Sequence, residues 1–167
     1  MKNSTVRTLC RVAVLIALEI VFSRFLSLNT QNLRIGIGFV PIALCGILYG
    51  PWWAGAAAGI ADVLGTFLTP YGLYPPITLT AILTGLFFGL FLHRKNAGFL
   101  TGVLPCALVN AAGLSLGLQS YWLSLLYHTP YAVQVAARLA ECAVLVILYL
   151  ILLPLMQRFA LKLDHLK

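Results

Sequence analysis

The sequence predicts an all-α integral membrane protein: a bundle of roughly six transmembrane helices with both termini in the cytoplasm. Apolar residues make up 61% of the chain and charged residues only 9%, whereas soluble domains carry about a quarter charged residues. The mean hydropathy is +0.97, and apolar runs recur along the whole chain with short turns between them. At about 20 residues per span, the chain accommodates about six helices in a single transmembrane domain, residues 1–167.

The distribution of basic residues sets the predicted orientation. With the N-terminus inside, eight of them fall on the cytoplasmic side: Lys2, Arg7, Arg11, Arg94, Lys95, Arg158, Lys162 and Lys167. The positive-inside rule therefore places both termini in the cytoplasm. The net charge of +7 follows from this topology, so we expect the lipid bilayer and not a nucleic acid as its partner.

The first three helices are expected at residues 9–28, 39–50 and 52–68, with a loop at 29–38. The second segment is short, about 18 Å at 1.5 Å per residue. It spans a membrane only if residues 35–38 join it or if the bilayer is thinner there. The third segment is rich in glycine and alanine, which predicts a helix buried among the others.

The remaining helices are expected at residues 77–92, at 98–126 with a kink at Pro105, and from Pro130 to about residue 155. A turn-rich aromatic loop, residues 69–76, precedes the first of them. Tyr71, Tyr74 and Trp122 then lie at the outer ends of the helices, where interfacial belts also place such residues.

Six charges are not explained by topology. Each lies in an apolar run or in the outer half of the bundle: Glu19, Arg24, Arg34, Asp62, Arg138 and Glu141. A charge at membrane depth costs several kcal/mol, so each is a candidate for a functional site.

Gln134, Arg138 and Glu141 have the spacing i, i+4, i+7 and share one face of the last helix. They either form a self-neutralising Arg138–Glu141 pair or line a ligand cavity, with Arg138 binding an anionic group. Asp62 needs a partner or a proton, since an isolated buried carboxylate becomes neutral. Arg24 or Arg34 is the expected partner.

One catalytic motif occurs and is rejected. The stretch 113–117 reads G-x-S-x-G around Ser115, but that motif works on a strained turn between strand and helix. Here it lies in an apolar helix, and the nearest base in the sequence, His128, is expected in a loop. We find no spacing typical of a metal site, a P-loop or a dinucleotide fingerprint, so we expect no cofactor, no metal and no enzyme activity.

Several segments together resemble the substrate-binding S components of energy-coupling factor (ECF) transporters, and among them the folate family. They are LSL at 26–28, LRIGIGFVPIAL at 33–44, GILYGPW at 46–52, GIADVLG at 59–65 and PPITLTAILTGL at 75–86. The resemblance covers nearly the whole chain.

The resemblance implies a vitamin-binding bundle in the plasma membrane that docks on a transmembrane coupling subunit driven by two ATPases. It implies that Ala13 and Ala17 contact the coupling subunit, whereas by spacing alone they form an ordinary helix-packing pair. The loop 29–38 is implied to act as a gate that places Arg34 against the ligand.

Folate chemistry suits the remaining polar residues. A carboxylate accepts two hydrogen bonds from the pterin edge, aromatic rings stack on the pterin, and arginines bind the glutamate tail. Asp62 or Glu141 is expected to bind the pterin edge. Arg34, with Arg24 or Arg138, is expected to bind the carboxylates of the glutamate tail. The full expected ligand-binding set is Arg24, Arg34, Asp62, Tyr71, Tyr74, Thr78, Asn110, Trp122, Gln134, Arg138 and Glu141.

Three alternatives remain. The first is an S component for another small molecule, such as pantothenate or a queuosine precursor. The second is an intramembrane serine hydrolase with Ser115 as nucleophile. The third is a structural bundle in which three arginines and three acids only neutralise one another. Arg34, near glycines on an expected gate, argues against this last alternative.

Overall fold

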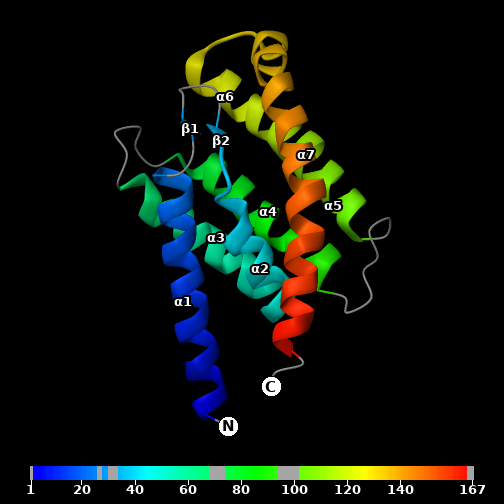
Figure 1. Ribbon diagram of the computed structural model, residues 1–167. Coiled ribbons are helices and arrows are strands. Elements are labelled where there is room, and N and C mark those ends of the chain that lie inside the picture. The colour runs from blue at the N-terminus through cyan, green and yellow to red at the C-terminus, as the bar shows by residue number, and fades with distance from the viewer. Residues whose placement is uncertain (1, 26–27, 30–33, 68–73, 94–101, 165–167) are drawn as a thin grey trace.

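The computed structural model describes residues 2–25, 28–29, 34–67, 74–93 and 102–164. Over these residues the chain is a helical bundle with one short β-hairpin, and both ends of the chain lie at the same end of the bundle (Figure 1). The helices are α1 (Lys2–Arg24), α2 (Phe39–Tyr49), α3 (Pro51–Thr66), α4 (Pro75–Leu92), α5 (Leu104–Leu108), η2 (Val109–Gln119), α6 (Ser120–Tyr127) and α7 (Tyr131–Asp164).

The first helix ends earlier than expected, because the chain leaves it to form the hairpin. Strand β1 (Leu28–Asn29) pairs antiparallel with β2 (Arg34–Ile35), at the end of the bundle opposite the termini (Figure 1). Of the two conditions under which the short second segment could span a membrane, its extension by residues 35–38 is not met: Ile35 pairs in β2 and α2 begins at Phe39. Helix α2 is only 11 residues long.

Helices α2, α3 and α4 pack closely through glycine. Gly50 has a φ of 92° and separates α2 from α3, where Pro51 begins the next helix. A methyl group on Gly46 would lie 2.8 Å from the backbone nitrogen of Gly89, so neither helix tolerates a side chain at this crossing. Helix α3 has one buried face of small residues and Asp62. Its opposite side is an exposed stripe that includes Trp52, Ile60 and Leu64, so the expected burial among the other helices holds for one face only.

The expected fifth helix is a run of α5, η2 and α6. Pro105 lies in the first turn of α5, where its missing N–H removes no helical hydrogen bond. The helix departs from α geometry on both sides of α5: residues 102–103 and the 11 residues of η2 are π-helical. Such stretches are rare and are often found at functional sites.

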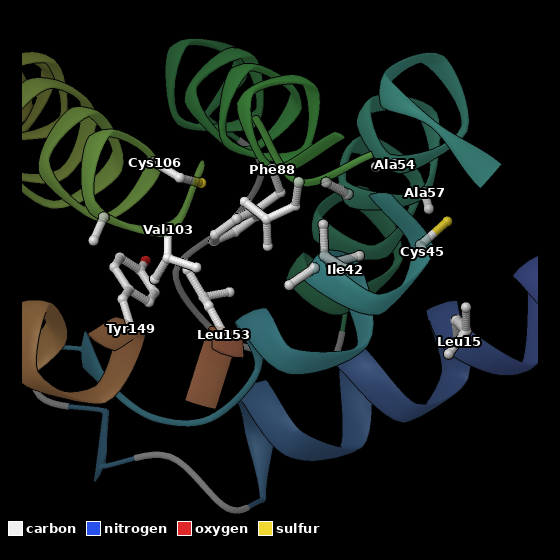
Figure 2. Packing of buried hydrophobic residues seen from close by; sticks show 14 of the residues in the cluster. Leu15, Ile42, Cys45, Ala54, Ala57, Phe88, Val103, Cys106, Tyr149 and Leu153 are labelled. Carbon is white, nitrogen blue, oxygen red and sulfur yellow. The ribbon is translucent and has the colours of Figure 1, made fainter. Parts of the chain in front are cut away.

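The core lies where α2, α4, α5 and α7 meet. Figure 2 shows Ile42 of α2, Phe88 of α4 and Tyr149 and Leu153 of α7 converging on one another. Two of the described helices are long and apolar enough to cross a membrane, Pro75–Leu92 and the segment Arg138–Arg158 of α7. The last helix continues past the expected residue 155, through Pro154 to Asp164.

Candidate functional site

A cavity of about 170 Å³ lies inside the bundle, between α1, α3 and α4 on one side and η2 and α7 on the other. Its polar lining residues are Glu19, Ser23, Asp62, Thr80, Thr84, Asn110, Ser115, Gln119 and Glu141. Three of the chain's four acidic residues thus face one cavity. Within the part of the chain that the structure describes, its lining contains no lysine or arginine. The charged groups of this lining are therefore carboxylates, which only accept hydrogen bonds, beside hydroxyl and amide groups that both donate and accept.

The first charged cluster joins the ends of three helices, and we call it the Asp62 cluster: Arg24 of α1, Asp62 of α3 and Thr78 of α4. The Arg24 Nη2 atom lies 4.0 Å from Asp62 Oδ1. The Thr78 hydroxyl donates a hydrogen bond of 2.8 Å to Asp62 Oδ2. Asp62 is buried, with 8% of its surface exposed. Arg24 and Arg34 are the two expected partners of Asp62. Within the described side chains, Arg24 is the one that lies beside it.

The second charged cluster, the Glu141 cluster, comprises Arg138 and Glu141 of α7 and Ser115 of η2. Arg138 donates from Nε to Glu141 Oε2 at 2.9 Å and from Nη2 to Oε1 at 3.0 Å. Nη2 also lies 3.4 Å from the Ser115 hydroxyl oxygen, which accepts a weak hydrogen bond. Arg138 and Glu141 are each only 2% exposed. The ion pair expected from their spacing is present.

This pairing changes the role expected of Arg138. The planar guanidinium can form two parallel hydrogen bonds to one carboxylate. In Arg138 both of these bonds go to Glu141. Only Nη1 has no hydrogen-bond partner among the described residues. Glu141 lines the cavity, whereas Arg138 lies behind it. Arg138 thus holds Glu141 in this arrangement, and its expected contact with a ligand carboxylate stays a prediction.

Three aromatic side chains line the cavity: Phe39, Phe88 and Tyr149. The rings of Phe39 and Tyr149 meet edge to face with centroids 4.5 Å apart, and Phe88 meets Tyr149 at 5.6 Å. Two of the three aromatic residues expected from the sequence lie elsewhere. Tyr74 and Trp122 do not belong to the described lining, and Tyr71 lies outside the described residues.

The other predicted residues are divided. Asn110 lines the cavity and donates to the Cys106 carbonyl at 3.0 Å, while its Oδ1 has no partner in the described part of the chain. Gln134 is buried but lies outside the cavity lining, and it donates to Thr129 Oγ1 at 2.8 Å. Arg34 belongs to β2, and its side chain lies outside what the structure describes.

Several lining residues were not predicted as ligand contacts. Glu19 had a visible signal, because its charge interrupts an apolar run. Thr80 and Thr84 are four residues apart on α4, a weak sign of a polar stripe. Phe39, Phe88 and Tyr149 gave no signal, since aromatic residues are common throughout this chain and only the fold brings these three together.

Two smaller predictions also have a position in the structure. Ser115 lies inside η2 and its hydroxyl faces Arg138, far from the strand-to-helix turn that a serine hydrolase needs. Ala13 and Ala17 are both exposed on α1. They do not form a buried packing pair within the described bundle, and their contact with a coupling subunit stays a prediction.

An acceptor-lined cavity inside a bundle with membrane-crossing helices defines a small-molecule-binding protein of the membrane. The family of ECF-type riboflavin transporter S components matches residues 3–161. The chain belongs to this S-component family and is therefore a substrate-binding subunit of a transporter and not an enzyme.

Individual relatives are named for folate and not for riboflavin. The folate transporter FolT of Clostridium novyi (strain NT) is 34% identical over 141 residues, which cover 84% of this chain and 81% of that protein. FolT of Leuconostoc mesenteroides subsp. mesenteroides is 34% identical over 123 residues, 72% of this chain and 65% of that protein. A crystal structure of FolT bound with folic acid has a TM-score of 0.85, at 32% identity, and covers 91% of this chain and 93% of its own.

Proposed function

We propose that this chain is the high-affinity folate-binding S component of an ECF-type importer. The observation that carries the proposal is the cavity lined by Glu19, Asp62 and Glu141. The similarity to two proteins named folate transporters, and to a structure bound with folic acid, supports the same substrate. Riboflavin is the second candidate, because the matching family is described by that vitamin.

The chemistry of the two vitamins differs at the edge that enters such a cavity. The pterin edge of folate presents an exocyclic amino group beside a ring N–H, and a carboxylate accepts both hydrogen bonds at once. The corresponding edge of a flavin presents one N–H between two carbonyl oxygens. Those oxygens are acceptors and find no donor on a carboxylate. A cavity rich in carboxylates therefore favours the pterin.

Asp62 and Glu141 are the two candidates for the residue that reads the pterin. Asp62 is oriented by Thr78 and Arg24, and Glu141 by Arg138. The aromatic side chains beside them supply apolar surface for the flat ring. Each of these two carboxylates has an arginine beside it, which offsets part of the cost of burying a charge.

The glutamate tail of folate is dianionic and needs cations. The described cavity lining supplies none, so the tail points to the end of the bundle that carries the β-hairpin. Arg24 ends α1 there, and Arg34 belongs to β2, just before the lining residue Gly36. The hairpin and the segment around it are the proposed gate.

The transporter context completes the proposal. Both ends of the chain lie at one end of the bundle, which supports an even number of spans, and the positive-inside rule favours that end as cytoplasmic. Membership of the family supports the proposal of six spans in the plasma membrane, with a transmembrane coupling subunit and two ATPases as partners. The exposed pair Ala13 and Ala17 is the proposed contact with the coupling subunit.

Equilibrium titration of the purified protein in detergent, without ATP, tests the proposal. Folate is expected to quench the fluorescence of Trp52, Trp53 or Trp122 and to saturate at about one molecule per chain with nanomolar affinity. Riboflavin is expected to bind far more weakly. Saturation by riboflavin alone would replace the folate assignment with the second candidate, and binding of neither vitamin by monodisperse protein would contradict both.

A further inference from the structure

The guanidinium of Arg24 lies directly against the backbone of α3 at Gly65. A Cβ atom on Gly65 would lie 2.6 Å from Arg24 Nη2, 2.7 Å from Nε and 3.1 Å from Cζ. Contacts this short do not occur between real atoms, so the position that Arg24 occupies exists only because residue 65 has no side chain. A methyl group there would displace the whole charged end of Arg24.

The same placement brings Arg24 beside Asp62, a residue of the cavity lining. Gly65 follows Asp62 by three residues, so the two lie on one face of α3. The Nη2 atom that touches Gly65 is the one that lies 4.0 Å from Asp62 Oδ1. Asp62 in turn lines the cavity. The contact at Gly65 therefore determines where the cation of the Asp62 cluster sits.

Gly65 differs in this respect from the other buried glycines of α3. A Cβ on Gly55 or Gly59 would meet only apolar side chains and one carbonyl of α4, chiefly Leu86 and Ile82 respectively. Those two glycines serve helix packing. Glycine within a helix is less favourable than alanine, and at Gly65 the side chain that gains space is the charged Arg24.

We infer that Gly65 is a positioning residue for cargo binding: it seats the Arg24 guanidinium across α3 and thereby sets its place beside Asp62 and the cargo. This inference rests on the proposed function, since the cargo is the molecule that the cavity binds. It adds a residue to the site that touches no cargo itself and acts through Arg24.

A double-mutant cycle tests the inference. Gly65→Ala is expected to weaken cargo binding about tenfold in the parent background. In an Arg24→Ala background the same substitution is expected to have no further effect, because there is no guanidinium left to displace. A matched control is Gly59→Ala, which crowds the apolar Ile82 side chain on the same helix and is expected to lower thermal stability while affinity stays within about twofold.

Two results would overturn the inference: unchanged affinity in Gly65→Ala, or an equal loss with and without the Arg24 side chain. If Gly65→Ala alone does not fold, recovery of folding in Arg24→Ala/Gly65→Ala supports the contact, and failure of the double variant contradicts it. The cargo for this cycle is whichever of folate and riboflavin the parent binds, so a wrong folate assignment is recognised separately. If the parent binds neither vitamin, the same four proteins are compared by melting temperature, which tests the contact between Gly65 and Arg24 without any cargo.

Discussion

The bundle holds two arginine–carboxylate pairs that are built differently. Arg138 and Glu141 lie on one helix, three residues apart, and meet in a bidentate pair at 2.9 and 3.0 Å. Arg24 and Asp62 come from two helices, and their nearest charged atoms are 4.0 Å apart. The first pair is almost inaccessible, with both side chains 2% exposed, whereas those of the second are 13% and 9% exposed.

The difference indicates different roles. The α7 pair forms as soon as that helix forms, and it satisfies most of its own hydrogen-bonding capacity. The Asp62 cluster depends on how α1, α3 and α4 meet, and it lies beside the hairpin at the proposed gate. The Arg24–Asp62 pair is held by the packing of separate helices, so it can adjust when cargo enters. The Arg138–Glu141 pair lies within one helix and is a fixed part of the cavity wall.

The largest expected effect comes from breaking the α7 pair. Arg138→Met leaves Glu141 buried without its counter-charge, which costs about 3–5 kcal/mol of stability. Thermal unfolding in detergent is expected to show a large fall in the melting temperature. Adding Glu141→Gln to the same variant removes the uncompensated charge and is expected to recover most of the loss. A single variant as stable as the parent would show that the pair does not stabilise the bundle.

Asp62→Asn addresses the second pair with an isosteric change. The amide keeps the shape but can accept only one of the two pterin hydrogen bonds and loses the attraction to Arg24. A hydrogen bond to a charged group is worth about 1.5–3 kcal/mol, so folate affinity is expected to fall about tenfold to a hundredfold. Titration measures this, and the melting temperature is expected to fall less than in Arg138→Met. Unchanged affinity would assign the pterin to Glu141.

Thr78→Val removes the hydroxyl that orients Asp62 while keeping the size of the side chain. The lost hydrogen bond of 2.8 Å is expected to cost about 1 kcal/mol, or roughly fivefold in folate affinity. Ser124→Ala is the control, because the Ser124 hydroxyl donates to the Tyr121 carbonyl of its own helix and Ser124 does not belong to the described cavity lining. If the two variants bind folate equally, Thr78 has no special role in the site.

The smallest effect is expected at Ser115. Its hydrogen bond with Arg138 is long, at 3.4 Å, and Arg138 keeps both bonds to Glu141 without it. Ser115→Ala is therefore expected to change folate affinity by less than about twofold. A larger loss in the titration would mean that the hydroxyl contacts the cargo directly.

The two pairs also show how much of the site could be predicted from the sequence. The Arg138–Glu141 pair could be predicted because residues three apart on a helix face each other whatever the rest of the fold does. The partner of Asp62 stayed open between Arg24 and Arg34, because that choice depends on how α1 packs on α3. Gly65 was visible only as one small residue among many, since its contact with Arg24 joins segments about forty residues apart.

The fold was predictable to a similar extent. Apolar runs indicated the class and most helix positions. The small residues of α3 indicated its buried face but not the exposed stripe on its other side. The β-hairpin could not be predicted, because strands of two residues carry no alternating pattern. The π-helical stretch η2 and the aromatic lining of Phe39, Phe88 and Tyr149 likewise depend on contacts between distant helices.

The most direct test of the account is competition against bound folate by its two halves. Pteroate carries the pterin without the glutamate, and p-aminobenzoylglutamate carries the glutamate without the pterin. Because the cavity offers carboxylate acceptors and its described lining supplies no cation, pteroate is expected to displace folate effectively and p-aminobenzoylglutamate hardly at all. Stronger displacement by p-aminobenzoylglutamate would contradict the account, since it would place the anionic tail and not the pterin in the carboxylate-lined cavity.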